Sequence, residues 1–406
     1  SHKSYQYNSN SEFEIQDMTQ GSRFSEDAFL SEYRLNVDYS DILFKKFKLE
    51  TGYQFTYRPY TAYFDAKTYN AGNWEMDSLY STDQEFTQTK HAGYFMLSGN
   101  IKKFDVQLGL RAEDFYSEFI LDSDNYEDIT QDYLYWFPSI HISKRMKNMS
   151  QWMLSYSRRI NYPQDWMLGP TPMYSDAFLY QEGNANLLPE LIDSYELSHI
   201  RFIAKKHMLS MTGFFRQVND EIARTMYVND QGILTVGWDN LAINRSYGFE
   251  LGSNLNISKM LSANLAASAF GLHSEGYLAN TDLNFDVFSW TVRGMFNIKA
   301  TPNTSFQISG FFNSGAKEQQ GIRNDQGMIS MSLRQDFMKK QLSLTFNFQD
   351  VFNLFKWEYE ITQPTYTTRM SFIPPYPQLS LALSYRINNY KPSQKNNDTY
   401  GPGMGM

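Results

Sequence analysis

The stretch QLSLTFNF, residues 341–348, decides the fold class. Its apolar residues alternate strictly with polar ones: Leu342, Leu344, Phe346 and Phe348 against Gln341, Ser343, Thr345 and Asn347. Side chains on a β-strand point alternately to opposite faces, so this pattern predicts a strand with one apolar and one polar face. The same alternation recurs in LSLALSYRI (379–387), in WTVRGMFNI (290–298) and in segments around 33–39, 49–57, 106–112, 249–257 and 261–269.

About fifteen segments of this kind follow one another along the chain, and helical periodicity is almost absent. Most are closer to the roughly 9–11 residues of a tilted membrane-spanning strand than to the roughly 5–6 of a soluble one. A soluble β-sandwich, the alternative, would have shorter strands whose apolar faces meet in one core. The aromatic residues near segment ends (Tyr53, Tyr57, Trp136, Trp152, Tyr156, Trp290 and Tyr385) are typical of the interfacial girdles of a membrane barrel.

The links between these segments alternate in length. Short turns fall at 41–47, 101–104, 145–150, 204–208, 258–261, 300–304 and 338–341; long polar links fall at 61–84, 120–131, 161–190, 219–240, 273–284, 313–326 and 355–377. Short periplasmic turns and long extracellular loops are the layout of bacterial outer-membrane barrels. The sequence therefore predicts an all-β fold, a transmembrane antiparallel β-barrel embedded in the lipid bilayer of the outer membrane.

Composition excludes several function classes. The 406 residues carry a formal net charge of −8, which disfavours nucleic acid as a partner. Cysteine is absent, so the chain has neither disulfides nor thiolate metal sites. No metalloprotease histidine pair, phosphate loop, nucleophile elbow or dinucleotide motif occurs. We expect a protein that is not an enzyme, with no catalytic residues and no cofactor.

Several motifs resemble those of TonB-dependent outer-membrane receptors of the Bacteroidota type. They are GLRAED (109–114), SYSRRINYPQDWMLGP (155–170), EGNANLLPELIDSYEL (182–197), NLAINRSYGFEL (240–251), FQDVFNLFKWEYE (348–360) and the closing strand PPYPQLSLALSYRI (374–387). In NLAINRSYGFEL the spacing of Ala242, Gly248 and Glu250 departs from the family pattern.

The resemblance implies a barrel of 22 strands, a plug domain that fills it, and TonB as the energy-coupling partner. A chain with about fifteen strands would be the C-terminal barrel portion. On this reading residues 1–27 are the end of a preceding strand or extracellular loop, residues 28–388 form barrel strands, and residues 389–406 are a flexible periplasmic tail. An outer-membrane lipoprotein or another complex partner is a further possible contact.

Charged residues on the polar parity of the strands are candidate lumen residues. The set comprises Arg34, Arg111, Glu113, Glu250, Arg293 and Arg334. Both signs are present, so a simple ion sieve is not expected; a cross-strand network that stiffens the wall and contacts a plug competes with direct ligand contact. His141 alternates with Ile140 and Ile142 and should face the lumen as a solvated residue.

The long link 161–190 is rich in proline and aromatic residues. Trp166, Tyr174, Phe178 and Tyr180 could form a ligand-binding surface above the lumen, or could pack the loop against its neighbours. Asp122, Asp124 and Glu127, followed by Asp128, are a weak calcium candidate because carboxylates at such spacing can ligate that ion; a solvated acidic loop is the alternative.

The function implied by the resemblance is import of a scarce or bulky nutrient, whose class (siderophore, glycan or peptide) is unresolved. Two alternatives stay open. A receptor-like barrel could act as a non-transporting scaffold in an outer-membrane complex, or the barrel could be a passive pore.

Overall fold

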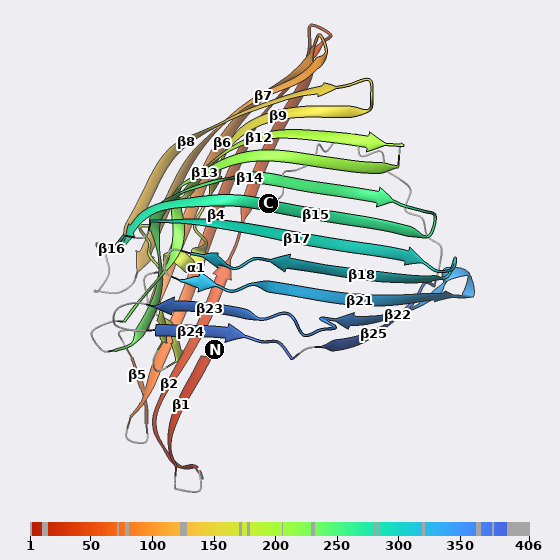
Figure 1. Ribbon diagram of the computed structural model, residues 1–406. Helices are drawn as coiled ribbons and strands as arrows, with labels where there is room; N and C mark the ends of the chain where they lie inside the picture. The colour runs from red at the N-terminus through yellow and green to blue at the C-terminus, as the bar shows by residue number, and fades with distance from the viewer. Residues whose placement is uncertain are drawn as a thin grey trace.

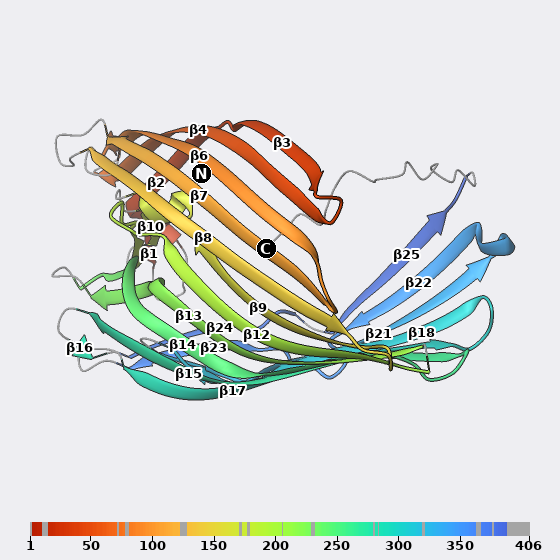
Figure 2. The same cartoon turned by 90° about the horizontal axis from the view of Figure 1, so that it is seen from above.

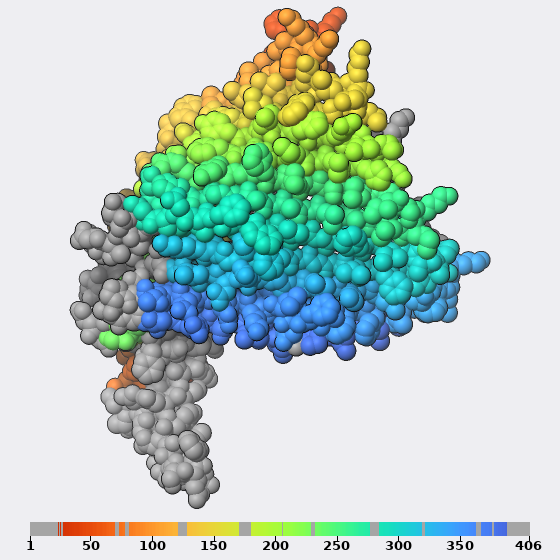
Figure 3. Space-filling view, in the orientation of Figure 1, coloured from red at the N-terminus to blue at the C-terminus, as the bar shows by residue number. Residues whose placement is uncertain are grey.

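One large curved β-sheet makes up most of the chain. The computed structural model describes residues 2–9, 15–70, 73–77, 81–121, 128–169, 173–176, 179–204, 206–228, 232–278, 281–282, 284–318, 321–362, 367–375 and 377–387. The sheet is strongly curved (Figures 1 and 2), and the segment that carries β10 lies on the inside of the curve in Figure 2. Figure 3 shows the strands packed side by side into a continuous wall that follows chain order.

Long antiparallel strands form this wall, each paired with the next long strand along the chain except β2, which pairs with β4. They are β1 (His2–Ser9), β2 (Ile15–Leu30), β3 (Tyr33–Leu43), β4 (Phe47–Asn70), β6 (Thr82–Ile101), β7 (Phe104–Leu121), β8 (Ile129–Arg145), β9 (Ser150–Asn161), β12 (Glu190–Ile203), β13 (His207–Val228), β14 (Leu234–Asn256), β15 (Leu261–Leu278), β17 (Phe285–Lys299), β18 (Thr304–Asn313), β21 (Gln326–Phe337), β22 (Leu342–Gln349) and β25 (Gln378–Tyr385).

Shorter elements decorate the ends of the long strands. They are β5 (Asn73–Met76), α1 (Asp165–Leu168), β10 (Met173–Asp176), β11 (Leu179–Gln181), β16 (Thr281–Asp282), a 3-10 turn (Met338–Lys340), and a separate small sheet of β19 (Ala316–Lys317), β20 (Ile322–Arg323), β23 (Trp357–Thr362) and β24 (Thr367–Phe372). Neither helical segment in the described part of the chain has the length and apolar character needed to cross a membrane.

The side chains of the wall separate into an apolar face and a polar face, as the alternating pattern of residues 341–348 predicts. Residues directly opposite each other on antiparallel strands share a face. On one face Phe346 pairs with Leu381, and these side chains are 42% and 68% exposed. On the other face Asn347 accepts a hydrogen bond from Ser332 Oγ (2.8 Å) and donates one to Ser380 Oγ (3.3 Å). The outer face is therefore apolar and uncovered by protein, and the inner face is polar and cross-linked.

The outer face also carries exposed aromatic rings, as expected for a girdle. Tyr53, Tyr57, Trp136, Trp152, Trp290 and Tyr385 are all among the exposed large side chains. Polar groups also occur on this face: Arg158 Nε and Nη2 both donate to the Asp193 carboxylate at 2.9 Å, and Tyr156 Oη donates to it at 2.8 Å. This cluster is neutral and internally hydrogen-bonded, so it can lie beside apolar surface at reduced cost.

The short turns lie where the sequence predicts them, but several predicted long loops are wrong in their extent. β4 runs on to Asn70, and β13 and β14 continue to Val228 and from Leu234, so much of 61–84 and 219–240 is strand. β4 alone has 24 residues, far more than the roughly 9–11 that cross a bilayer. The hairpins thus extend beyond the apolar band as ordered ladders.

The wall is an open sheet within the described residues. β3 pairs only with β4 and β25 only with β22, and no pairing joins these two edge strands. β2 continues the line of β3 along the far half of β4, with β1 outside it, so residues 2–9 and 15–30 are strands. Closure of a barrel is therefore not observed, while the antiparallel wall is. The predicted tail, 389–406, lies outside the described residues.

A buried aspartate ends β22 and redirects the chain. Asp350 is fully buried, and its carboxylate accepts hydrogen bonds from the backbone N–H groups of Leu354 and Phe355, both at 2.9 Å. These bonds satisfy donors that leave the ladder at the DVFNLF segment. The chain can then turn out of the wall and reach β23.

Candidate functional site in the mouth of the curved sheet

The long link between β9 and β12 folds onto the inner face of the extended hairpins. Leu168 of α1 and Leu187 are buried against Phe86 of β6 and Phe119 of β7, with Tyr60 of β4 packed beside them. Because apolar burial is the main source of favourable free energy, this cluster holds the described residues around Leu168 and Leu187 against β6 and β7. We call residues 162–189 the mouth loop.

The root of the mouth loop is fixed by Tyr162. Its ring stacks on Phe115 with centroids 4.6 Å apart, and its hydroxyl donates to Glu113 at 2.9 Å. Lys90 Nζ lies 5.3 Å from the centre of the same ring. Burial, together with the Glu113 carboxylate, raises the pKa of Tyr162, so the phenol stays protonated and remains a donor.

Glu113 joins this root to the charges of the inner wall. Its side chain is buried and accepts from Arg111 Nε at 2.6 Å, while Lys90 Nζ lies 3.7 Å away. Arg111 also donates to Gln54 on β4 at 2.9 Å. Two cations around one carboxylate compensate the cost of burying it.

A second attachment lies one turn further along the mouth loop. Asp165, the first residue of α1, accepts a hydrogen bond from Arg58 of β4 (Nη1 to Oδ1, 3.0 Å), and the second guanidinium nitrogen, Nη2, lies 2.7 Å from Oδ2 as an ion pair. A bidentate guanidinium–carboxylate pair fixes orientation as well as distance. Burial nevertheless raises the pKa of Asp165, so desolvation offsets part of this attraction.

The far half of the mouth loop is hydrogen-bonded to the β13–β14 hairpin. β11 runs parallel to β14, pairing Leu179 with Leu234 and Gln181 with Val236, and the Glu182 N–H donates to Val236 O at 2.9 Å. Leu188 N–H donates to Asn240 Oδ1 at 2.7 Å. The pairing between β11 and β14 is an exception to the antiparallel arrangement predicted for the whole chain.

The four aromatic residues predicted to bind ligand have different positions. Trp166 is 46% exposed and meets Trp238 of β14 edge to face, with ring centroids 4.7 Å apart. Tyr180 is buried and packs against Ala62, Phe64 and Ala66 of β4. Tyr174 pairs with Tyr180 through the backbone of β10, while its side chain and the whole of Phe178 lie outside the described residues. Among the described side chains of this set, only that of Trp166 is open to a ligand.

The predicted lumen charges all lie on the inner face. Arg34 pairs with Glu32 (2.6 Å), Arg111 with Glu113 (2.6 Å), and Arg334 with Asp336 (2.9 Å). Glu250 lies opposite Thr212 and Ser268, and Arg293 lies opposite Ala266 and Phe311. Arg34, Arg111 and Arg334 each pair with a carboxylate two residues away. Arg111 and Arg334 also donate hydrogen bonds across strands, to Gln54 and to Ser343, both at 2.9 Å.

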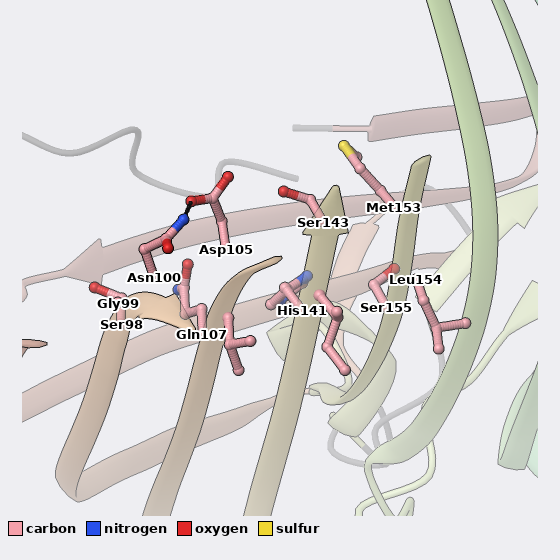
Figure 4. A pocket seen from close by; sticks show the side chains of 12 residues that line it. Ser98, Gly99, Asn100, Asp105, Gln107, His141, Ser143, Met153, Leu154 and Ser155 are labelled. Carbon is pink, nitrogen blue, oxygen red and sulfur yellow. Dashed lines mark hydrogen bonds between the residues drawn. The ribbon is translucent and has the colours of Figure 1, made fainter. Parts of the chain in front are cut away.

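His141 lines a hollow on the inner wall near the short turns. The hollow has a volume of about 520 Å³, and Ser98, Gln107, His141 and Ser155 form one row across it (Figure 4). Asn100 donates to Asp105 at 3.0 Å on the next row. The prediction that His141 faces the inside is confirmed.

The calcium candidates Asp122, Asp124 and Glu127 lie outside the described residues. In the part of the chain that the structure describes, no three acidic or histidine side chains converge as a metal site would require.

Sequence reasoning missed Arg224, Trp238 and Tyr359, which line the other side of the mouth. Arg224 and Trp238 fall within 219–240, which its polar composition led us to assign as a loop. The alternation of Ile222, Arg224 and Met226 was a usable signal, since it continues the period of β13.

Comparison with known proteins agrees with this geometry. Residues 1–385 match the model of the outer membrane protein beta-barrel family, and the chain belongs to that family. It is an outer-membrane protein. A search of curated proteins finds no significant match.

Solved structures share the fold at low identity. The unliganded ferric citrate transporter FecA is 13% identical, with a TM-score of 0.59 over 91% of this chain and 56% of its own. The ferric yersiniabactin uptake receptor FyuA from Yersinia pestis is 10% identical (TM-score 0.56; 88% and 54%). The ferric-catecholate import receptor Fiu from E. coli K12 is 12% identical (TM-score 0.59; 90% and 55%). The chain spans about half the length of these structures.

Proposed function

We propose that the chain is the C-terminal barrel portion of a TonB-dependent receptor that imports a scarce or bulky nutrient. The observation that carries this proposal is the mouth loop. It is docked on the inner face by a buried apolar cluster, by Tyr162–Glu113 and by Arg58–Asp165. A docked loop over a charged hollow suits capture of one molecule better than free diffusion.

The solved structures that share the fold also support an import function. Ferric citrate, ferric yersiniabactin and ferric-catecholate are named as the cargo of three structures that share the fold. We propose that further strands bridge β3 and β25, completing a barrel of 22 strands around a plug, with TonB as the energy-coupling partner. The unpaired edges of β3 and β25 favour this, because open edges and their backbone groups are costly in a bilayer.

The test compares what cells remove from their medium. Wild-type cells, cells lacking this protein and cells lacking TonB are grown in the same defined medium, and the spent media are compared by mass spectrometry. We expect at least one compound that only the wild type depletes. The control is a variant with Lys103→Gln at an exposed short turn, which should deplete the compound as the wild type does.

Two other outcomes decide against import by TonB. Depletion that needs this protein but not TonB would support a passive pore. Unchanged media, together with loss of a co-purifying outer-membrane protein in the deletion strain, would support the scaffold function.

A further inference from the structure

Arg224 occupies the side of the mouth that faces the mouth loop. It lies directly opposite Trp238 in the β13–β14 ladder, so the two side chains share a face. On that face Trp238 packs both against the cluster around Leu168 of α1 and against the cluster formed with Ile361 of the small sheet. Arg224 therefore lies beside a residue that contacts both the mouth loop and β23.

Three other arginines around the mouth have carboxylate partners among the described residues. Arg58 pairs with Asp165, Arg323 with Glu318 and Arg369 with Glu360. Arg224 makes no ion pair with any carboxylate of the described residues; the group that interacts with it electrostatically is the phenol of Tyr359.

Glu182, which directly follows β11, does not neutralise Arg224 either. Glu182 is hydrogen-bonded to Tyr227, on the opposite face of the hairpin. The side chain of Arg224 is open to solvent, and partial desolvation by its neighbours lowers the pKa of its guanidinium.

Aromatic residues lie near Arg224: Trp238 is its cross-strand partner, and Tyr359 packs on the same cluster as Trp238. Trp166 stands edge to face with Trp238, and Tyr359 is half-buried in the small sheet, where the ring of Trp357 stacks on it at 6.3 Å between centroids. Rings contribute flat apolar contact, while a guanidinium recognises a planar carboxylate through two parallel hydrogen bonds. A single guanidinium balances one negative charge, which favours a carboxylate over a doubly charged phosphate.

We propose that Arg224, Trp166, Trp238 and Tyr359 form a subsite for a carboxylate attached to a planar ring. The inference rests on the proposed import function, because it names the chemical class of the imported molecule. The carboxylate binds Arg224, and the ring lies against the exposed face of Trp166.

The test uses equilibrium binding, so it needs neither TonB nor transport. The mature full-length protein is purified from its own outer membrane after labelling with 5-fluorotryptophan and is placed in lipid nanodiscs. Three probes with the same ring are titrated: 1-naphthoate, 1-naphthylmethanol and 1-naphthylmethylamine. Fluorine NMR follows Trp166 and Trp238, whose signals are assigned with the Trp166→Phe and Trp238→Phe variants.

We expect 1-naphthoate to shift both signals and to bind about tenfold more tightly than the alcohol, as a charge-assisted hydrogen-bonded pair predicts. The amine should bind most weakly. Arg224→Gln should remove the preference for the carboxylate, and Arg224→Lys should keep part of it. Arg293→Gln, at another inner-face arginine lower in the wall, is the matched control and should leave the preference unchanged.

The subsite is disproved if none of the probes shifts either tryptophan signal, if acid and alcohol bind equally, or if Arg224→Gln keeps the preference. Heat-modifiability on a gel shows that each variant is folded, so a lost preference cannot be assigned to misfolding. Failure of the medium-depletion test with success of the binding test would remove import and leave the subsite standing.

Discussion

Separating Arg58 from Asp165 should loosen the mouth loop by a predictable amount. The pair makes a hydrogen bond of 3.0 Å and a second N–O contact of 2.7 Å, and the two side chains are 30% and 18% exposed. Charge-assisted hydrogen bonds contribute about 1.5–3 kcal/mol when well shielded, and exposed ion pairs about 0–1. Partial exposure and the desolvation that raises the pKa of Asp165 place the coupling between these limits, at about 1–2 kcal/mol.

That coupling can be measured by hydrogen exchange with a double-mutant cycle of Arg58→Gln and Asp165→Asn. The reporters are amides whose bonds join the loop to β14: Glu182 N–H to Val236 O at 2.9 Å and Leu188 N–H to Asn240 Oδ1 at 2.7 Å. Each single variant should accelerate their exchange about 5–30-fold, and the double variant should add little to that. Effects of the two singles that multiply in the double, or unchanged exchange in either single, would refute the reasoning.

Three further predictions address the membrane face, the topology and alkaline pH. Leu344→Arg, on the outer face, should cost about 2–4 kcal/mol of unfolding free energy in a denaturant titration, while Thr345→Arg, on the inner face, should cost clearly less; the reverse order would contradict the register. Cysteine at Arg369 should react with a membrane-impermeant label on intact cells and cysteine at Lys102 should not, and labelling at Lys102 alone would invert the topology. Burial raises the pKa of Tyr359 from 10.0 to about 12, so the contribution of the buried phenol to stability is complete below pH 10 and is lost as pH rises toward 12. The difference in tyrosinate absorbance between wild type and Tyr359→Phe should show this late titration, and a midpoint near pH 10 would contradict it.

The wall of the fold could be predicted from the sequence because its signal is local. In 341–348 and 379–387 every second residue is apolar, and the structure pairs these segments in that register, with Leu344 opposite Leu383. The short turns follow from the same pattern, since each falls where alternation stops and resumes within a few residues. The inner position of Arg111 and Glu113 follows from parity alone.

The extensions of the hairpins were not predicted because apolar and polar residues no longer alternate strictly there. Beyond the apolar band neither face needs to be wholly apolar, so Arg224 can sit two residues from Met226 on the same face. Composition then resembles that of a loop, although the ladder continues from Ile222 to Val228 opposite Asn240 to Leu234. The length and polarity of a segment do not distinguish a strand from a loop where water lies on both sides of the strand.

The arrangement of the mouth depends on contacts between distant parts of the chain. Arg58 and Asp165 are 107 positions apart, and nothing near either residue indicates the other. The same holds for Tyr180, whose burial against Ala62 and Phe64 follows from where the loop lies rather than from its own neighbours in sequence. Such pairs become visible only when strand order is known.

The parallel pairing of β11 with β14 bears on how such proteins diversify. On the N-terminal side of Ala242, β14 no longer pairs with β15. There β11 pairs with Leu234–Val236 on the edge that β15 leaves open. Removing or replacing the loop by itself would leave a bare strand edge at the cell surface, where strand edges recruit foreign chains. Variation in cargo should therefore arise by exchange of the loop and the β13–β14 hairpin together, as a single cassette. A chimaera between relatives is expected to assemble only when its crossovers lie outside both.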